Sequence, residues 1–193
     1  MRVVRLLDEP DWPSLIPAID AIFFAASKPQ SFAAARARDD FRERWLGRYL
    51  TNDLDAFFIA RADHDASGTP APQPVAGYLA GSLDNPAKTA RFDDIGYFKQ
   101  AFADLCEAYP AHLHINVDER FRNQGVGAAL VAAFATHAAG RGTSGVHIVT
   151  SSAARNVRFY ERAQFSVLRT VAWNASEIVF MGRVLGLVPD PWV

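Results

Sequence analysis

The stretch from Val117 to Gly127 reads VDERFRNQGVG, and it joins two segments of different character. Before it, residues 111–118 alternate between apolar and polar side chains, which predicts a β-strand. After it, residues 125–139 carry apolar side chains at helical spacing and end before Gly140, which predicts a helix that stops at that glycine. The sequence here therefore predicts a strand, a short turn that contains glycine, and the start of a helix.

A helix start of this kind is suited to binding phosphate. Gly125 and Gly127 lack a Cβ atom, so the backbone can come close to a ligand. The first N–H groups of a helix have no partner within it and point outward at the positive end of the helix dipole. Arg122 adds a positive charge to the same turn. The candidate phosphate-binding residues are Arg122, Asn123, Gln124, Gly125, Val126, Gly127 and Ala128.

Other interpretations of the same glycines have to be weighed. A tight turn between a strand and a helix, without any ligand, stays open on this segment alone. A dinucleotide-binding turn would need a third glycine and an acidic residue ~20 positions later. A nucleoside-triphosphate loop would carry Lys-Ser or Lys-Thr after the glycines, where this chain has Ala128-Ala129.

Working outward from this turn, hydrophobic periodicity predicts seven strands and five helices. The strands are predicted at 2–7, 55–62, 75–83, 111–118, 145–151, 167–173 and 177–184, and the helices at 11–26, 34–50, 95–108, 125–139 and 153–163. Residues 64–74 are predicted to form a loop and 186–193 a tail. This order predicts an α/β or α+β fold with a mixed sheet and helices on both faces, in one domain over residues 1–193.

Composition excludes several classes of protein. The net charge of -1 provides no basic field for nucleic acid or an anionic membrane. The single cysteine, Cys106, cannot form an intrachain disulfide, and its position on an apolar helix face predicts a core residue. No segment approaches the ~20 apolar residues of a membrane span, and the N-terminus has no signal-peptide core. We therefore expect a soluble, cytoplasmic protein, and no histidine and acid spacing predicts a metal site.

Two motifs in register resemble a known family. Arg-x-x-Gly-x-Gly after a strand that ends in Val-Asp resembles the pyrophosphate-binding motif of the GNAT acetyltransferase superfamily. Further along, residues 156–165 (NVRFYERAQF) resemble its second signature, Asn-x-x-Ala-x-x-Phe-Tyr-x-x-x-Gly-Phe. The chain departs from that signature at Arg158, where a small residue is expected, and at Gln164, where the family has glycine.

Four further segments are similar to a narrower group. Residues 77–84, 109–116, 145–147 and 179–183 resemble the acetyltransferase-like domain at the C-terminus of animal O-GlcNAcases and its free-standing bacterial relatives. The animal domains are regarded as having lost the phosphate-binding turn. This chain keeps Arg122, Gly125 and Gly127, so the resemblance implies that it binds the cofactor.

The resemblance implies a largely antiparallel GNAT-like sheet and an N-acetyltransferase that uses acetyl-coenzyme A by direct transfer in a ternary complex. Backbone groups of Asn116 and Val117 would hold the thioester and the pantetheine arm, with the Val117 N–H as oxyanion donor. Asn156 would hold the cofactor or an ordered water, and Tyr160 would donate a proton to the leaving thiolate. A helix-start hydrogen bond for Asn156 and a packed core phenol for Tyr160 stay open.

The acceptor amine is not identified by the sequence. A lysine side chain, a protein N-terminus, an amino sugar and a polyamine all stay open, as does the oligomeric state. A pseudoenzyme that binds acetyl-coenzyme A or another protein without transfer is the main alternative. A transferase of longer acyl groups is a second one.

Polar side chains on the predicted strand 111–118 suggest where an acceptor would bind. His112, His114 and Asn116 fall on one face, and a buried polar row needs partners, so this face is expected to border a cleft. His114, with an ordinary pKa of ~6.5, is the candidate general base, and structural histidines are the alternative. His147 on the next strand can join the same cluster.

One helix carries an aromatic stripe and a charged face. Phe41, Trp45 and Tyr49 are four residues apart within 34–50, which predicts core packing. The basic face of the same helix is expected to be solvated. The alternative is that this helix and the one before it wall the acceptor site.

Overall fold

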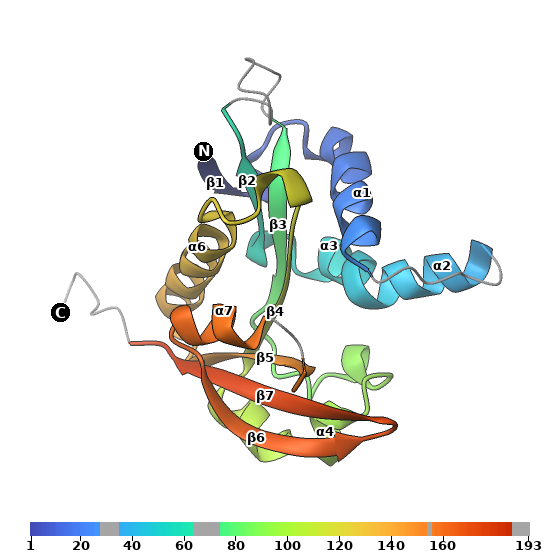
Figure 1. Cartoon of the computed structure of the whole chain (residues 1–193), viewed down its shortest axis with the longest axis vertical. Coiled ribbons are helices and arrows are strands. Elements are labelled where there is room, and N and C mark those ends of the chain that lie inside the picture. The colour runs from blue at the N-terminus through green and yellow to red at the C-terminus, as the bar shows by residue number, and fades with distance from the viewer. Residues whose placement is uncertain (28–34, 64–73, 154–155, 187–193) are drawn as a thin grey trace. The chain divides into compact units, whose positions relative to one another are not determined.

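The computed structural model describes residues 1–27, 35–63, 74–153 and 156–186. Figure 1 shows their helices and strands, and the strand order is β1-β2-β3-β4-β5-β7-β6. The strands are β1 (Arg2–Arg5), β2 (Phe57–Arg61), β3 (Val75–Ser82), β4 (Ala111–Val117), β5 (Gly145–Ser151), β6 (Ser166–Trp173) and β7 (Ser176–Val184). The α-helices are α1 (Ile16–Ala26), α2 (Ala35–Arg42), α3 (Arg48–Asn52), α4 (Tyr97–Gln100), α5 (Ala103–Ala108), α6 (Val126–Gly140) and α7 (Val157–Arg162).

The predicted fold class is confirmed. All seven predicted strands are present, and the sheet is mixed, with one parallel pair recorded, β4 with β5, among antiparallel ones. The chain forms two compact units. Unit 1 holds Met1–Gly81 and His114–Phe134, and unit 2 holds Ser82–Leu113 and Ala135–Val193. Strand β4 and helix α6 each contribute residues to both units.

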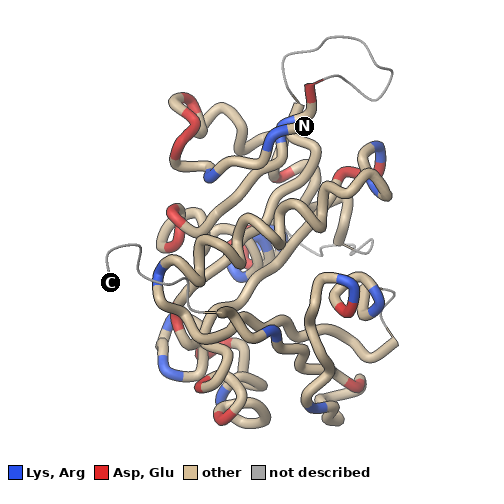
Figure 2. The backbone as a smooth tube through the Cα atoms, turned by 90° about the vertical axis from the view of Figure 1, so that its left-hand side faces the viewer, with Lys and Arg blue, Asp and Glu red and all other residues tan. Residues whose placement is uncertain are grey.

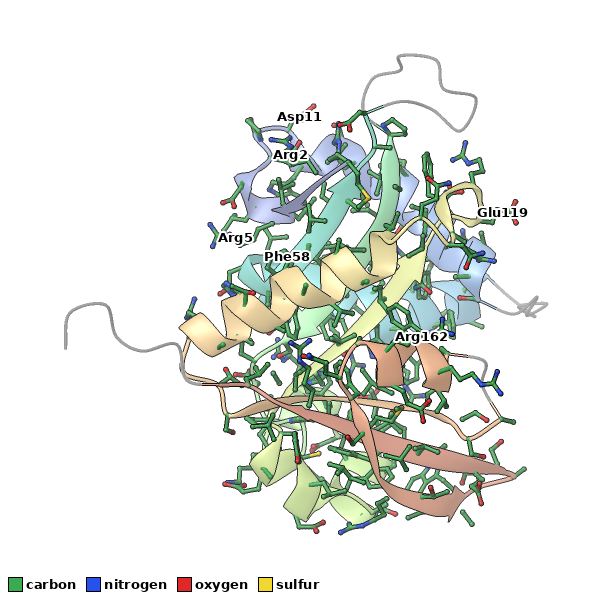
Figure 3. The ribbon with its side chains drawn as sticks, turned by 60° about the vertical axis from the view of Figure 1, so that its left-hand side comes forward. Arg2, Arg5, Asp11, Phe58, Glu119 and Arg162 are labelled. Atoms are coloured by element: carbon green, nitrogen blue, oxygen red, sulfur yellow. The ribbon has the colours of Figure 1, made fainter. Side chains whose placement is uncertain are left out.

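In unit 1 the sheet is covered on both faces. Strands β1, β2 and β3 pair antiparallel, with Ile59 opposite both Val4 and Tyr78. Alternation along β2 sends Phe58 to the α6 face, where its ring meets Phe134 edge-on at 6.3 Å (Figure 3). On the opposite face Phe57 stacks on Tyr78 at 5.6 Å, and α1 and α3 cover this side (Figure 1). The predicted helices on both faces are therefore present in this unit.

In unit 2 the antiparallel pairs β5 with β7 and β7 with β6 carry a second apolar cluster. Phe180 on β7 packs against Phe102, with ring centroids 5.2 Å apart. Cys106 is fully buried on α5, as the sequence predicted, and burial raises the pKa of its thiol to about 12. A thiol with that pKa stays protonated at neutral pH, so Cys106 is a core residue and not a nucleophile.

The helices predicted at 11–26 and 153–163 are shorter in the structure, where α1 begins at Ile16 after a 3-10 turn and α7 begins at Val157. Two other predicted helices are each divided. The helix predicted at 34–50 is α2, a π-helical turn from Glu43 to Gly47, and α3, with the Arg48 N–H donating to the Glu43 carbonyl five residues back. The helix predicted at 95–108 is divided into α4 and α5, because Phe102 leaves helical geometry at φ −133° and is fully buried there. Both departures follow from tertiary packing, which local propensity does not contain.

Charged residues are concentrated outside the strands. In Figure 2 most acidic and basic positions lie on loops and short helices, and the strands β3, β4 and β5 contain no charged residue. None of the helices in the described parts of the chain is long and apolar enough to cross a membrane. Those parts also contain no cluster of three histidine, cysteine or acidic side chains arranged to hold a metal ion.

Helix α6 ends at Gly140, where the sequence predicts it to stop, but Gly140 is not the residue that caps it. The left-handed residue is Gly142, with a φ of 75°. The Thr143 N–H then donates to the Ala138 carbonyl and the Gly142 N–H to the Ala139 carbonyl, which satisfies the last turn of the helix.

Helix α7 ends in the same way, but with glutamine in place of glycine. Gln164 has a φ of 68°, its N–H donates to Glu161, and the Phe165 N–H donates to Tyr160. A side chain in this left-handed region costs about 1 kcal/mol relative to glycine. The departure from the family signature at this position is therefore accommodated at the expense of local strain.

We expect Gln164→Gly to raise the free energy of unfolding by about 1 kcal/mol, because glycine relieves the left-handed strain at the end of α7. Urea denaturation followed by circular dichroism would measure it. Gln164→Ala is the matched control, since alanine keeps the strain and should give no gain. Equal stability of the two variants would contradict the assignment.

Candidate active site

The predicted turn after β4 forms an open cradle. A 3-10 turn from Glu119 to Phe121 leads into it, with the Asp118 carboxylate accepting from the Arg120 N–H at 3.0 Å. The chain then turns through two left-handed residues, Asn123 at φ 61° and Gly125 at φ 80°. The Ala129 N–H donates to the Gly125 carbonyl, so helix α6 begins directly after this glycine.

The helix start has the features of an anion site. In an α-helix that begins at Val126, the N–H groups of Val126, Gly127 and Ala128 have no acceptor within the helix. No protein atom lies within 4 Å of where a Cβ of Gly125 would be, so the space above the helix start is open. A diphosphate fits this arrangement, because it can accept from these N–H groups at the positive end of a 15-residue helix.

The remaining cradle residues fix the loop and supply charge. Arg122 is exposed, and its Nε donates to the Val117 carbonyl at 3.3 Å, which holds the guanidinium beside the turn. The exposed Gln124 donates to the Arg120 carbonyl at 3.0 Å. A cavity of about 440 Å³ also borders Val117 and Arg122, with alanines of α1 on its other side. The cradle is therefore preformed, with a cavity beside it.

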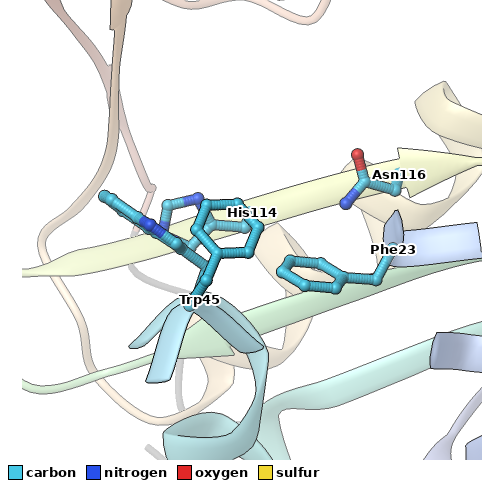
Figure 4. Close-up of a pocket in the computed structure, with 5 residues that line it drawn as sticks. Phe23, Trp45, His114 and Asn116 are labelled. Atoms are coloured by element: carbon cyan, nitrogen blue, oxygen red, sulfur yellow. The ribbon is translucent and has the colours of Figure 1, made fainter. Parts of the chain in front are cut away.

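A second cavity of unit 1 opens beside β4, upstream of the cradle. Its volume is about 360 Å³, and it is lined by Phe23, Phe41, Trp45, His114 and Asn116. Figure 4 shows Phe23 on α1 and Trp45 on the π-helical turn Glu43–Gly47, which we call the π-turn. It also shows His114 and Asn116 on β4, beside these two rings. The sequence prediction that His114 and Asn116 border a cleft is thus confirmed. The aromatic stripe is core only at Tyr49, because Phe41 and Trp45 are half-buried cavity walls.

Asn116 is positioned by a residue that sequence reasoning missed. Its Nδ2 donates to the Tyr78 hydroxyl at 2.7 Å, and the Tyr78 ring is fixed by stacking on Phe57. Burial raises the pKa of Tyr78, so the phenol stays neutral. A usable signal was present, because a tyrosine within the buried strand 75–82 must find a partner for its hydroxyl.

His114 lies against two aromatic rings. Its imidazole meets Trp45 edge-on at 5.2 Å and Tyr49 edge-on at 5.5 Å. Burial and, second, the positive charge of Arg48 lower the pKa of His114 to about 4. The expected ordinary pKa near ~6.5 is therefore wrong. At neutral pH the imidazole is uncharged and can accept a proton without first losing one.

Because the pKa of His114 is low, the loss of activity on the acidic side of the pH profile is expected at a lower pH than an ordinary histidine would give. If His114 is the base, kcat/KM corrected for the neutral fraction of the amine should be flat from pH 8 to about pH 5 and fall below about pH 4.5. His114→Gln should remove the limb and leave coenzyme A affinity intact. A pH series with circular dichroism at each point would measure this. A limb near pH 6.5, or one that persists in the variant, would contradict the role.

His112 does not share the cleft, although it shares the strand face. It belongs to unit 2, is 2% exposed, and meets the ring of Phe92 edge-on at 4.7 Å. His147 stacks on it at 5.5 Å and bonds through Nδ1 to the Tyr109 carbonyl. His147 therefore joins His112, as predicted, but both histidines are buried and neither borders the cleft that was expected on this face.

The second family motif, residues 156–165, lies in unit 2 and comprises α7 with the residues directly before and after it. The Asn156 side chain accepts from the Thr150 hydroxyl at 3.1 Å and makes no capping hydrogen bond, so the helix-start alternative is wrong. Tyr160, one turn later, is 5% exposed, and its ring packs edge-on against Phe159 and Phe165 at 5.0 and 5.5 Å. Burial raises the pKa of Tyr160, so its hydroxyl keeps its proton at neutral pH.

The structure brings together the predicted residues of each unit. In unit 1, β4 carries His114 and Asn116 into the aromatic cavity, and its last residue, Val117, leads directly into the cradle. In unit 2, Asn156 and Tyr160 are placed one turn apart on the same helix face. The two units thus carry the first and the second motif respectively.

Comparisons with known proteins establish the family. The model of the acetyltransferase (GNAT) family matches residues 21–165, most of the chain, and the chain therefore belongs to this family. A search of curated proteins gave no match.

Solved structures with a similar fold cover nearly the whole chain. The crystal structure of PH1933 from Pyrococcus horikoshii OT3 has a TM-score of 0.67 at 13% identity, over 96% of this chain and 99% of that one. The crystal structure of SsHAT has a TM-score of 0.65 at 21% identity, over 96% and 98%. A chain of the NatC complex bound to Gag peptide and CoA has a TM-score of 0.61 at 14% identity, over 96% and 100%. At these identities the likeness concerns the fold.

Proposed function

We propose that this chain is an N-acetyltransferase that moves the acetyl group of acetyl-coenzyme A directly to an amine. The observation that carries the proposal is the cradle, where Gly125 at φ 80° opens a 15-residue helix onto free space next to Arg122. Membership of the GNAT family supports the same donor. We further propose that residues 1–193 act as one functional domain, since β4 and α6 run through both units.

In this proposal unit 1 holds the donor by its diphosphate and backbone. The N–H groups of Val126, Gly127 and Ala128 bind the diphosphate, and Arg122 with the loop residues Asn123 and Gln124 borders it. Backbone groups of Asn116 and Val117 orient the pantetheine arm, with the Val117 N–H stabilising negative charge on the thioester oxygen. The thioester supplies the activated acetyl group, and the chain supplies its orientation.

Proton transfers are assigned to two side chains. His114, neutral at physiological pH, accepts the proton that the amine releases. Tyr160, protonated at that pH, donates to the sulfur of the leaving coenzyme A, while Asn156 holds the donor or a water on the same helix face. The roles of Tyr160 and Asn156 follow from the family resemblance, and that of His114 from its place beside the cavity on β4. Burial gives His114 and Tyr160 the ionisation states that these roles need.

The alternative is a protein that binds acetyl-coenzyme A without transferring it, as the resemblance to the domain of animal O-GlcNAcases suggests. The intact cradle and the open cavity at His114 and Asn116 favour an enzyme. The test is calorimetry with coenzyme A, followed by release of the free thiol from acetyl-, butyryl- and octanoyl-coenzyme A in the presence of a panel of amines. Binding of coenzyme A without amine-dependent release of its thiol would support the non-transferring alternative. Faster release from butyryl- or octanoyl-coenzyme A than from acetyl-coenzyme A would identify a longer acyl-coenzyme A as the donor.

A further inference from the structure

The cavity beside His114 has walls of one chemical kind. Phe23 on α1 is 3% exposed and packs against Phe41 of α2, with ring centroids 5.3 Å apart. Trp45 of the π-turn forms the facing wall, half-buried and held edge-on by His114 at 5.2 Å. Three aromatic rings from three separate elements thus enclose one space (Figure 4).

The polar groups of this cavity carry no charge at neutral pH. His114 and Asn116 are its polar lining residues, and none of the lining residues is acidic. The Asn116 Nδ2 is engaged by Tyr78, which leaves the carbonyl oxygen of the amide as an acceptor. A cavity of this kind can receive the N–H of an uncharged amine.

The charges around the cavity are mostly positive. Arg42 pairs with Asp20 at 2.8 Å, the guanidinium of Arg44 lies 5.2 Å from the Trp45 ring centroid, and Arg48 contributes to lowering the pKa of His114. Glu43, the acid of the π-turn, is exposed, and its carboxylate lies against Gly47. A second ammonium group on the acceptor would find no carboxylate among the described lining residues, so no ion pair inside the cavity would offset the loss of its hydration, and such an acceptor is disfavoured.

The volume narrows the acceptor further. An engineered apolar cavity of about 150 Å³ holds benzene. At about 360 Å³, this cavity has room for one aromatic ring with a short aminoalkyl chain. Aromatic walls favour such a ring through edge-on and offset contacts beyond the burial of its area.

We propose that the acceptor is an arylalkylamine, a primary amine on a short chain that ends in an aromatic ring and carries no second cation. The inference rests on the proposed transfer function and names its substrate class. The ring occupies the space between Phe23, Phe41 and Trp45, and the amine nitrogen lies at the His114 and Asn116 end. Nitrogen attacks the thioester carbonyl, the amine proton passes to His114, and the carbon–sulfur bond breaks as Tyr160 gives its proton to the sulfur, so that coenzyme A leaves as the thiol. Solvent then carries a proton from His114 back to Tyr160.

The experiment measures kcat/KM at saturating acetyl-coenzyme A for 2-phenylethylamine, butylamine and spermidine, each corrected for the fraction of neutral amine. Burial of the ring is worth about 1–3 kcal/mol, so we expect at least a ~10-fold preference for 2-phenylethylamine. Trp45→Leu should remove most of that preference, with butylamine affected less than ~3-fold. Trp12→Leu is the matched control, since Trp12 belongs to the same unit and does not line the cavity.

Failure of this inference differs from failure of the proposed function. Turnover of spermidine or butylamine above that of 2-phenylethylamine, or insensitivity to Trp45→Leu, would overturn the acceptor class and leave the transferase standing. If no amine is acetylated, calorimetry with 2-phenylethylamine decides. If wild type binds 2-phenylethylamine and Trp45→Leu does not, the aromatic site is supported and the transfer function is refuted. If wild type does not bind it, the aromatic site is refuted.

Discussion

Tyr160→Phe should lower kcat by at least ~10²-fold and leave coenzyme A affinity nearly unchanged. The substitution removes one oxygen, and the ring contacts with Phe159 and Phe165 stay in place. A coenzyme A thiolate leaves poorly without stabilisation, and loss of a positioned general acid typically costs ~10²–10⁴-fold. Because burial raises the pKa of Tyr160, the phenol is protonated across the usual assay range. A raised pKa makes the phenol a weaker acid, so its proton passes to the sulfur only as negative charge builds up there.

Tyr109→Phe is the matched control for this result. It makes the same change in the same unit, at a tyrosine whose ring packs against Phe180 and to which no catalytic role is assigned. Its turnover should be close to wild type. Full turnover of Tyr160→Phe with a good acceptor would return Tyr160 to core packing. A loss of stability at an unchanged rate per folded molecule would lead to the same conclusion.

The second large effect is expected at the cradle. Gly125→Glu should weaken coenzyme A binding by about 10²-fold or more, measured by calorimetry. The new side chain enters the open space above the helix start and places a carboxylate where a diphosphate would accept from the N–H groups. Loss of charge-assisted hydrogen bonds together with like-charge repulsion amounts to about 3 kcal/mol, which is about 10²-fold in affinity.

Backbone strain must be separated from lost binding in this variant, because φ 80° disfavours any side chain at Gly125. Gly142 offers a matched control: it has φ 75°, it also has no protein atom within 4 Å of a built Cβ, and it follows the opposite end of the same helix. Gly142→Glu should lose a similar amount of stability and keep its coenzyme A affinity. Equal affinity of Gly125→Glu and wild type would refute the cradle.

Sequence reasoning predicted the features that local pattern determines. Alternation placed His114 and Asn116 on one face of β4, and glycine spacing placed the helix start at Gly125, one residue before the observed start at Val126. It identified Gly125 from its missing Cβ, and the structure adds a second reason, the left-handed φ. The alternation in β4 and the glycine spacing before α6 each involve residues only a few positions apart in the chain. This is the range over which sequence patterns are informative.

Features that depend on distant neighbours were not predictable. The lowered pKa of His114 needs the burial that Trp45 and Tyr49 provide and the charge of Arg48, all more than 60 residues away in the chain. Gly142, and not Gly140, is the left-handed residue that caps α6, and which of the two takes this role depends on how far packing extends the helix. The interpretation of Phe41 and Trp45 as core failed because a helical stripe has the same spacing whether it faces a core or a cavity.

The π-turn from Glu43 to Gly47 also bears on how this chain can vary through changes in its gene. A turn closed over five residues holds one amino acid more than an α-helix requires. Removing a single codon within it would restore regular winding and redirect the side chains of the turn itself, while the flanking helical segments keep their orientation because the wide turn already absorbs the extra residue. Trp45 would swing away from the ring it faces, while the flanking helical segments could remain intact. At this position a three-nucleotide deletion reshapes the cavity more than most point mutations would.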